Sequence, residues 1–104
     1  ICRSAIDQMA RFYAVKLGNK EIRCNCVLPT RITKPENYKF YRKKNNPISS
    51  MMKRITPLNR MGDSQDVANL VEFLTSKKSS FITGCSIPID GATHLQSHES
   101  IAKK

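Results

Sequence analysis

Apolar residues recur every three or four positions at the start of the chain, and this period predicts an amphipathic helix from residue 1 to Leu17 with one wide apolar face. Gly18 and Asn19 follow directly and predict the helix end, because both residue types tolerate the left-handed conformation that closes a helix. The apolar positions are Ala5, Ile6, Met9, Ala10, Phe12, Tyr13 and Leu17.

The next two segments have different patterns. Residues 22–28 are partly alternating and then continuously apolar, which predicts a strand buried on both faces and ended by Pro29. Residues 34–55 are polar and basic with interleaved aromatic residues, and Pro35 and Pro47 interrupt any long element. An irregular excursion with one or two short helices is expected there.

A helical period returns after Gly62. Asp63 suits the N-cap of this second helix, and the expected buried stripe is Val67, Leu70, Val71 and Leu74. A turn at Thr83 and Gly84 then leads into a short strand from Cys85 to Ile89, and residues 94–104 form a polar tail.

The order helix, strand, excursion, helix, strand is half of an α/β layer. Two parallel strands need a crossover connection of this kind, and parallel sheets are normally covered on both faces. Because two strands cannot supply such a sheet alone, the pattern predicts an α/β fold that is incomplete over these 104 residues.

Composition narrows the classes of partner. Eighteen Lys and Arg face eight Asp and Glu, and the net charge of +10 favours anionic partners, although a simple solubility charge is more common. No apolar run approaches the roughly 20 residues that span a bilayer. The chain has four cysteines without metal-ligand spacing, and they suit small buried residues in a reducing compartment: Cys2, Cys24, Cys26 and Cys85. The two histidines, His94 and His98, do not make a metal site.

Four stretches in the same order carry a resemblance to a known family. They are RSAIDQMARFYAVKL, IRCNCVLPTRIT, PLNRMGDSQDVANLVEFL and FITGCSIPIDGA. Together they resemble the C-terminal half of a short-chain dehydrogenase/reductase over most of residues 1–93. The resemblance implies the C-terminal part of a Rossmann-like, doubly wound parallel sheet, with residues 34–55 as the substrate lid and 94–104 as a tail.

The family opens the first of these helices with a Tyr-x-x-x-Lys pair. Its tyrosine is the general acid/base, and its lysine holds the cofactor ribose and lowers the pKa of the tyrosine. Arg3 falls on the lysine position, so the resemblance implies a catalytic and cofactor-binding role for Arg3. A guanidinium keeps the positive charge but is bulkier and planar, so the exchange is not conservative. The family's tyrosine, serine and glycine-rich turn would all precede residue 1, and we expect residues 1–104 alone to be inactive.

The resemblance also assigns cofactor contacts after the first strand. Pro29, Thr30, Ile32 and Thr33 match a segment that contacts the nicotinamide carboxamide and the diphosphate, with Thr30 in place of the usual glycine. Asn25 is given only a structural hydrogen-bonding role, and Arg60 with Asp66 is expected to brace the second helix. No residue is assigned to a metal.

The implied function is hydride transfer between NAD or NADP and a carbonyl or alcohol. The basic excursion would suit a substrate on an acidic carrier, and it equally suits a solvated surface. Homo-oligomers, a cytoplasmic location and no membrane association are also implied. The alternatives are a non-catalytic scaffold, motivated by Arg3, and a nucleic-acid-binding module built on Lys34 to Arg54. The last ranks lowest, because no recognition motif accompanies the charge.

Overall fold

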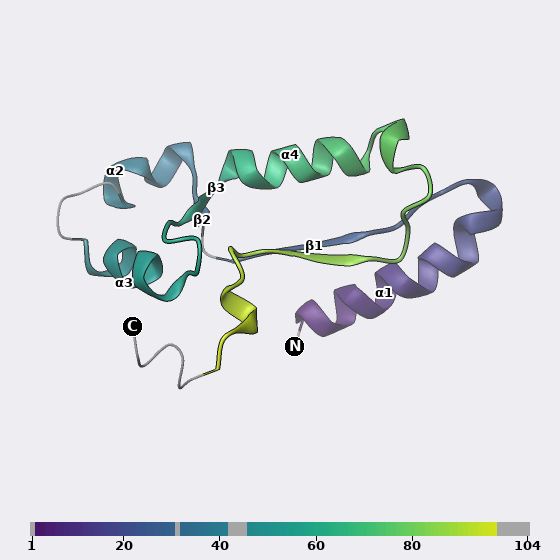
Figure 1. The fold of residues 1–104 in the computed structure, drawn as a ribbon. Coiled ribbons are helices and arrows are strands. Elements are labelled where there is room, and N and C mark those ends of the chain that lie inside the picture. Colours follow the sequence, from purple (N-terminus) through teal and green to yellow (C-terminus); the bar gives the residue numbers. More distant parts are fainter. Residues whose placement is uncertain (1, 31, 42–45, 98–104) are drawn as a thin grey trace. The chain divides into compact units, whose positions relative to one another are not determined.

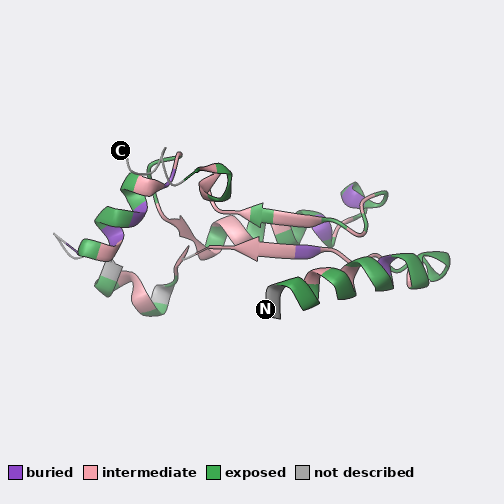
Figure 2. Cartoon of the chain, turned by 90° about the horizontal axis from the view of Figure 1, so that it is seen from below, coloured by how far each residue is buried: buried purple, intermediate pink, exposed green. Residues whose placement is uncertain are grey.

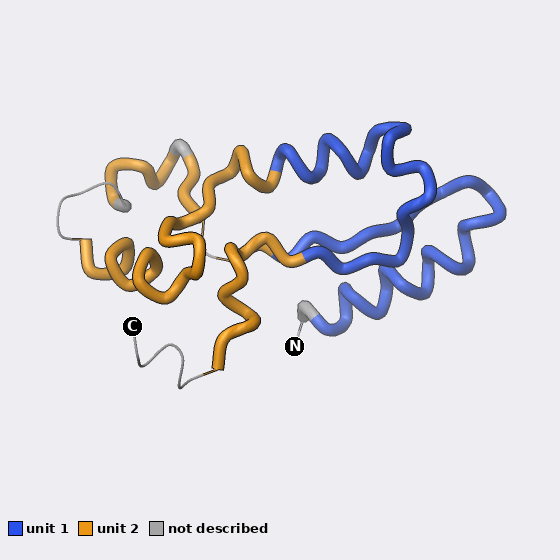
Figure 3. Tube along the Cα trace, in the orientation of Figure 1, with its two compact units in different colours: residues 1–28, 68–87 blue, residues 29–67, 88–104 orange. Residues whose placement is uncertain are grey.

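The computed structural model describes residues 2–30, 32–41 and 46–97. The chain forms two compact units, one of Ile1–Leu28 with Ala68–Ile87 and the other of Pro29–Val67 with Pro88–Lys104 (Figure 3). Among the described residues, no helix combines the length and apolar character needed to cross a membrane.

The first unit contains a parallel strand pair between two helices. The helices are α1 (Cys2–Leu17) and α4 (Ser64–Leu74), and the strands are β1 (Cys26–Pro29) and β4 (Ser86–Ile89). The first residues of α4 and the last residues of both strands belong to the second unit. Cys26 N donates to the Cys85 carbonyl, and Thr30 N donates to the Ile89 carbonyl. Because the residue number rises in both segments from the first hydrogen bond to the second, the two segments run parallel. Within this unit α1 and α4 lie on opposite sides of the strands, as expected for a parallel pair (Figure 1).

The first strand begins four residues later than the predicted Ile22 and includes Pro29 as its last residue. Side chains replace the regular ladder before it. The Cys24 N–H donates to Thr83 Oγ1 (3.0 Å), and Asn25 donates from Nδ2 to the Ile82 carbonyl (3.1 Å) and accepts from Cys85 N (3.0 Å). The structural hydrogen-bonding role predicted for Asn25 is therefore confirmed, and the second strand also matches its predicted range within one residue.

Arg23 closes the C-terminal end of α4. Its Nη1 donates to the carbonyls of Leu74 (2.7 Å) and Ser79 (3.0 Å) and to Ser79 Oγ (2.8 Å), while Nη2 donates to the Ser76 carbonyl (3.2 Å). The last carbonyls of a helix have no partner within the helix, and a cation there also interacts favourably with the helix dipole. The contact joins residues more than fifty positions apart in the sequence.

The predicted closure of α1 by Gly18 or Asn19 is wrong. The chain continues as a 3-10 turn over Gly18–Lys20, and the residue with left-handed backbone is Glu21, at φ 61°. The turn satisfies the backbone, because the Glu21 N–H donates to the Gly18 carbonyl (3.0 Å) and the Ile22 N–H to the Leu17 carbonyl (3.3 Å).

Little of the apolar surface of the first unit is buried (Figure 2). Among its residues whose burial is described, Ala14, Cys26 and Leu74 are the buried apolar ones. Large side chains along α1 remain about half exposed: Ile6, Met9 and Phe12. Val71 is exposed rather than part of the predicted buried stripe, and Cys85 is exposed rather than buried. The physical reason is size, since two short strands cannot cover the whole apolar face of each helix.

The second unit contains the excursion. Its elements are β2 (Ile32–Thr33), a 3-10 turn (Pro35–Asn37), α2 (Tyr38–Tyr41), α3 (Pro47–Ile55), β3 (Gly62–Asp63) and a 3-10 turn (Thr93–Leu95). Ile32 pairs with Gly62 and Thr33 with Asp63 in a parallel register. The prediction of one or two short helices between residues 34 and 55 is confirmed.

Asn46 organises the described part of this excursion. Its Oδ1 accepts from the Ile48 and Ser49 N–H groups (both 3.0 Å), which makes it the N-cap of α3, and its Nδ2 donates to the Phe40 carbonyl (2.7 Å). Asn46 is buried, as is Met52 on the inner face of α3. One side chain thereby starts α3 and ties it to α2.

Candidate functional site

A cavity of about 460 Å³ lies within the second unit. Thr30 contributes to it from the end of β1, and Ile89 and Asp90 contribute from the end of β4. The carboxyl ends of parallel strands are the usual place for ligands in open α/β sheets. The volume falls in the range of small-molecule sites.

The walls of the cavity combine apolar surface with a few polar groups. Met52 comes from α3, Leu58 from the turn that follows it, and Leu95 from the C-terminal segment. The polar residues are Thr30 and Thr56, the ion pair of Arg60 with Asp66, and the hydrogen-bonded pair of Asp90 with His94. Such a lining suits an apolar ligand that carries a small number of hydrogen-bonding groups.

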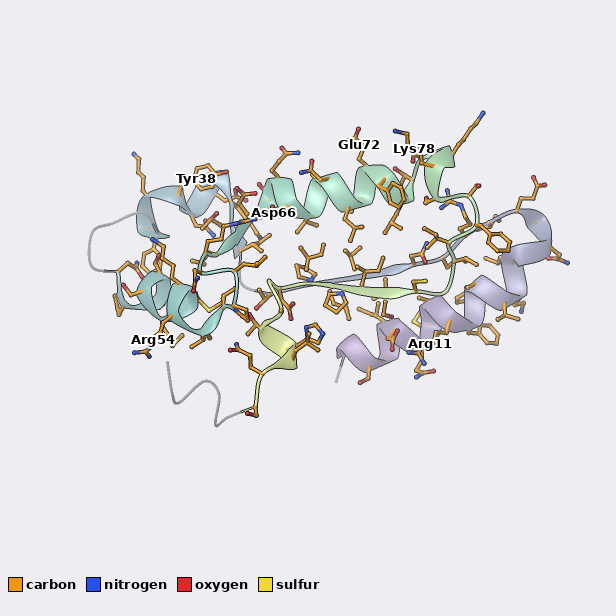
Figure 4. The ribbon with its side chains drawn as sticks, viewed as in Figure 1. Arg11, Tyr38, Arg54, Asp66, Glu72 and Lys78 are labelled. Atoms are coloured by element: carbon orange, nitrogen blue, oxygen red, sulfur yellow. The ribbon has the colours of Figure 1, made fainter. Side chains whose placement is uncertain are left out.

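Arg60 and Asp66 form a bidentate pair beside the first turn of α4. Nη1 lies 2.8 Å from Oδ2 and Nη2 lies 3.1 Å from Oδ1, and Asp66 also accepts from the Asp63 N–H (2.9 Å). The hydrogen bond from Arg60 lowers the pKa of Asp66, with help from the Asp63 amide. Asp63 itself caps α4 by accepting from the Gln65 and Asp66 N–H groups. The predicted bracing role of the pair and the predicted N-cap are confirmed. Figure 4 labels Asp66 at the start of α4.

Asp90 shapes the segment that follows β4. Its carboxylate accepts from Ala92 N (3.1 Å) and His94 N (3.1 Å), and His94 Nδ1 lies 2.8 Å from Oδ2. The Asp90 side chain is only 11% exposed, whereas that of His94 is 49% exposed. His94 therefore contacts its own turn, although the sequence places it at the start of the polar tail. His98 lies outside the described residues.

The structure brings one of the predicted cofactor residues to the cavity. Thr30 lines it, whereas Pro29, Ile32 and Thr33 are not among its described lining residues. The Thr33 hydroxyl instead donates to the Gly62 carbonyl (3.4 Å) across the β2–β3 pair. Arg3 lies in the first turn of α1, in the other unit, and its side chain lies outside the described residues.

Several lining residues were not predicted from the sequence. Met52 lies in the polar and basic stretch of residues 34–55, and Thr56 follows that stretch directly. The structure shows that both residues are buried. The available signal was the cap, because Asn46 followed by Pro47 begins a helix and thereby predicts which residues of α3 face inward. For Asp90 and His94 the four-residue spacing was visible, but their pairing depends on the turn between them.

The family model described as "Enoyl-(Acyl carrier protein) reductase" matches residues 1–94. The chain belongs to the short-chain dehydrogenase/reductase family. Among curated proteins of this family, the mouse (3R)-3-hydroxyacyl-CoA dehydrogenase is 42% identical over 93 residues, which are 89% of this chain and 34% of the mouse protein. The marmoset estradiol 17-beta-dehydrogenase 8 is 44% identical over 84 residues, which are 81% of this chain and 60% of that protein.

Solved short-chain dehydrogenases match the fold. A family member from Burkholderia thailandensis superposes with a TM-score of 0.80 at 26% identity, covering 96% of this chain and 39% of that one. A 4-hydroxyisoleucine dehydrogenase complexed with NADH superposes with a TM-score of 0.75 at 28% identity, covering 90% of this chain and 38% of that one. The predicted fold class, a partial Rossmann-like α/β sheet, is confirmed. The chain spans about a third of the length of the mouse relative.

Proposed function

We propose that this chain is the C-terminal part of an NAD(P)-dependent oxidoreductase that interconverts a carbonyl and an alcohol. The observation that carries the proposal is the cavity at the carboxyl ends of β1 and β4, reached by Thr30 in a chain of the short-chain dehydrogenase/reductase family. Two similar proteins support the cofactor and the reaction class, because one is a 4-hydroxyisoleucine dehydrogenase complexed with NADH and another is a (3R)-3-hydroxyacyl-CoA dehydrogenase.

The donor set near the cavity fits a nicotinamide cofactor. Thr30 offers a hydroxyl at the cavity wall, and the family motif adds the Ile32 amide and the Thr33 hydroxyl for a carboxamide or phosphate oxygen. The cofactor would supply the hydride, and these residues would orient it. Since the Thr33 hydroxyl is turned to the Gly62 carbonyl, Thr30 is the stronger candidate of the two.

The apolar side of the cavity is assigned to the substrate. Met52, Leu58 and Leu95 would exclude water from the aliphatic part of a small carbonyl compound or alcohol. The exposed cations at the end of α3, Lys53 and Arg54, lie next to Met52 in sequence and would suit an acidic carrier. Figure 4 labels Arg54 on this helix. Arg3, on the position of the family's lysine, would hold the ribose and favour the phenolate of a neighbouring tyrosine. Homo-oligomers and a cytoplasmic location belong to the same proposal.

Cofactor titration of the purified protein that contains this sequence tests the proposal. NADH and NADPH fluorescence would be followed with the unchanged protein and with two variants, Thr30→Ile and Thr30→Gly. We expect binding of one or both cofactors and a loss of roughly tenfold in affinity for Thr30→Ile, because that variant loses the hydroxyl and its bulk fills the cavity. Thr30→Gly loses the hydroxyl without adding bulk, so we expect its loss of affinity to be smaller than that of Thr30→Ile.

The opposite results would contradict the proposal. Absence of binding by the unchanged protein would favour the non-catalytic scaffold. Equal affinity for all three proteins would show that Thr30 does not face the cofactor. Arg3→Lys gives an independent check, because a lysine restored at that position should raise turnover if Arg3 has the proposed role.

A further inference from the structure

The C-terminal segment of the second unit holds the end of α3. The segment is Asp90–Gln96, and we call it the clasp. The side-chain amide of Gln96 donates to the backbone carbonyl of Ile55, the last residue of α3. The hydroxyls of Thr93 and Thr56 lie 3.5 Å apart, directly after that helix end. These contacts join residues that are 37 and 41 positions apart in the sequence.

The clasp also approaches the helix end too closely for a side chain at Gly91. A Cβ at Gly91 would lie 2.7 Å from Thr56 Cγ2 and 3.5 Å from Leu58 Cβ. Gly91 has φ +60°, a conformation that glycine adopts without strain. Thr56 is 3% exposed, and its methyl group lies directly against the Gly91 backbone. A side chain at Gly91 would therefore require one of the two segments to shift.

The clasp is held in shape by its own first residue. Asp90 accepts hydrogen bonds from Ala92 N and His94 N and pairs with the His94 ring, and the Asp90 carbonyl accepts from the Thr93 hydroxyl (2.7 Å). The Leu95 N–H in turn donates to the Ala92 carbonyl (3.1 Å). An element that is fixed internally can transmit its position to α3, whereas a loose tail could not.

Both the clasp and α3 line the same cavity. Met52 contributes from α3 and Thr56 from the position directly after it, and Gly91, His94 and Leu95 contribute from the clasp. We propose that the clasp positions the end of α3, that Gln96 is the positioning residue, and that the fit between the two segments determines which substrate the cavity accepts. The role in substrate choice rests on the proposed function, whereas the positioning of α3 does not.

Limited trypsin digestion of the protein that contains this sequence tests the positioning. Lys53 and Arg54 are exposed on α3, so cleavage after them reports how often the helix end opens. Gln96→Glu keeps the shape of the side chain but removes its donor. We expect cleavage at α3 to become roughly five to ten times faster, with cleavage after Arg11 in α1 unchanged. Gln8→Glu makes the same chemical change on the exposed face of α1 and should leave the α3 rate unaltered.

A steric pair of variants tests the same idea by a different contact. Gly91→Ala should also speed cleavage at α3, because its Cβ would press on the Thr56 methyl group. Adding Thr56→Ser removes that methyl group and should restore part of the protection, a non-additive result expected only for groups in contact. If neither Gln96→Glu nor Gly91→Ala changes α3 cleavage relative to Gln8→Glu, the clasp does not position the helix.

Steady-state kinetics connect the clasp to substrate choice. With a panel of aliphatic ketones of increasing length, Gln96→Glu should raise the KM of the best substrate roughly threefold to tenfold and change the ranking of the panel. The kcat and the KM for NAD(P)H should change less than about twofold, because the reacting groups are untouched. A fall in kcat at constant KM and constant ranking would overturn the role in substrate choice. No turnover with either cofactor would count against the proposed function alone, and the trypsin rates would still decide the positioning.

Discussion

Replacement of Arg23 is the most demanding test of how the first unit is held together. Arg23 is half-buried and donates four hydrogen bonds to the end of α4 and the turn after it, at 2.7, 2.8, 3.0 and 3.2 Å. Arg23→Ala would leave the carbonyls of Leu74, Ser76 and Ser79 without this donor. Leu74 and Ser79 are buried, so water cannot fully replace the lost bonds.

The expected size follows from the hydrogen bonds. A hydrogen bond to a charged group contributes about 1.5 to 3 kcal/mol, and bonds that share one side chain are not additive. We therefore expect Arg23→Ala to lower the free energy of unfolding by about 3 kcal/mol. Arg23→Lys should lower it by roughly half as much, because an ammonium keeps the charge at the helix end but lacks the planar fork.

Urea unfolding followed by circular dichroism measures these differences, and amide hydrogen exchange at residues 75–82 locates them. Arg11→Ala is the matched control. Arg11 is 60% exposed and has one ion pair, to Asp7 at 3.4 Å, so its removal should cost less than about 0.5 kcal/mol. The account of this unit would be refuted if Arg23→Ala and Arg11→Ala destabilised the protein equally, or if exchange at residues 75–82 did not accelerate in Arg23→Ala.

Three further changes have expected outcomes. Because Arg60 lowers the pKa of Asp66, the pair stabilises the fold above the unfolded pKa of about 4, and this contribution is lost as the pH falls through the folded pKa. Asp66→Asn should therefore make the free energy of unfolding less dependent on pH in the acid range, by under about 1 kcal/mol because Arg60 is largely exposed. An unchanged pH profile would contradict this expectation. Asn46→Ala should lower the free energy of unfolding by about 1 to 2 kcal/mol and accelerate amide hydrogen exchange in α3, because the N-cap is lost. Asn46→Asp should retain the cap and lose only the hydrogen bond to the Phe40 carbonyl in α2. Equal amide exchange rates in the two variants would argue against the cap. Gly84→Ala should lower the free energy of urea unfolding by about 1 kcal/mol or more, because the φ angle of Gly84 is +75°. Gly18→Ala, with open space around it, should change this free energy little. If Gly18→Ala were the more destabilising of the two, the backbone requirement assigned to Gly84 would be wrong.

The elements with strong local signals were predictable from the sequence. α1 and β4 match their predicted ranges closely, and Asp63 caps α4 as predicted, because periodicity and capping act between neighbours in the chain. The end of α4 was not predicted, because the helix ends at Leu74 and Lys77–Ser79 form a separate 3-10 turn. The start of β1 was not predictable, since the side chains of Asn25 and Thr83 replace the ladder there and lie 58 residues apart in the sequence. The length of the strand therefore depends on a distant turn.

The candidate site was predictable only where the family motif carries it. The motif singled out Thr30, which lines the cavity, and its role toward the cofactor stays a prediction. The clasp and its fit to Thr56 depend on long-range contacts that no local pattern encodes. Arg23 appeared as one cation among eighteen, and its role as a helix cap becomes visible only when α4 lies beside it.

The separation of Arg23 from its acceptors also sets the order in which the chain can fold. The side-chain bonds of Arg23 and Asn25 to the region around residues 74–85 close loops of more than fifty residues. The bonds of Asn46 span six residues or fewer. Closing long loops is slow, so α2 and α3 can form while the polypeptide is still being synthesised, and the first unit must wait until residue 85 has left the ribosome. During that interval α1 lacks the neighbours that the region of β4 supplies, because Ser86 contacts Asp7 and Gly84 lies close to Ala14.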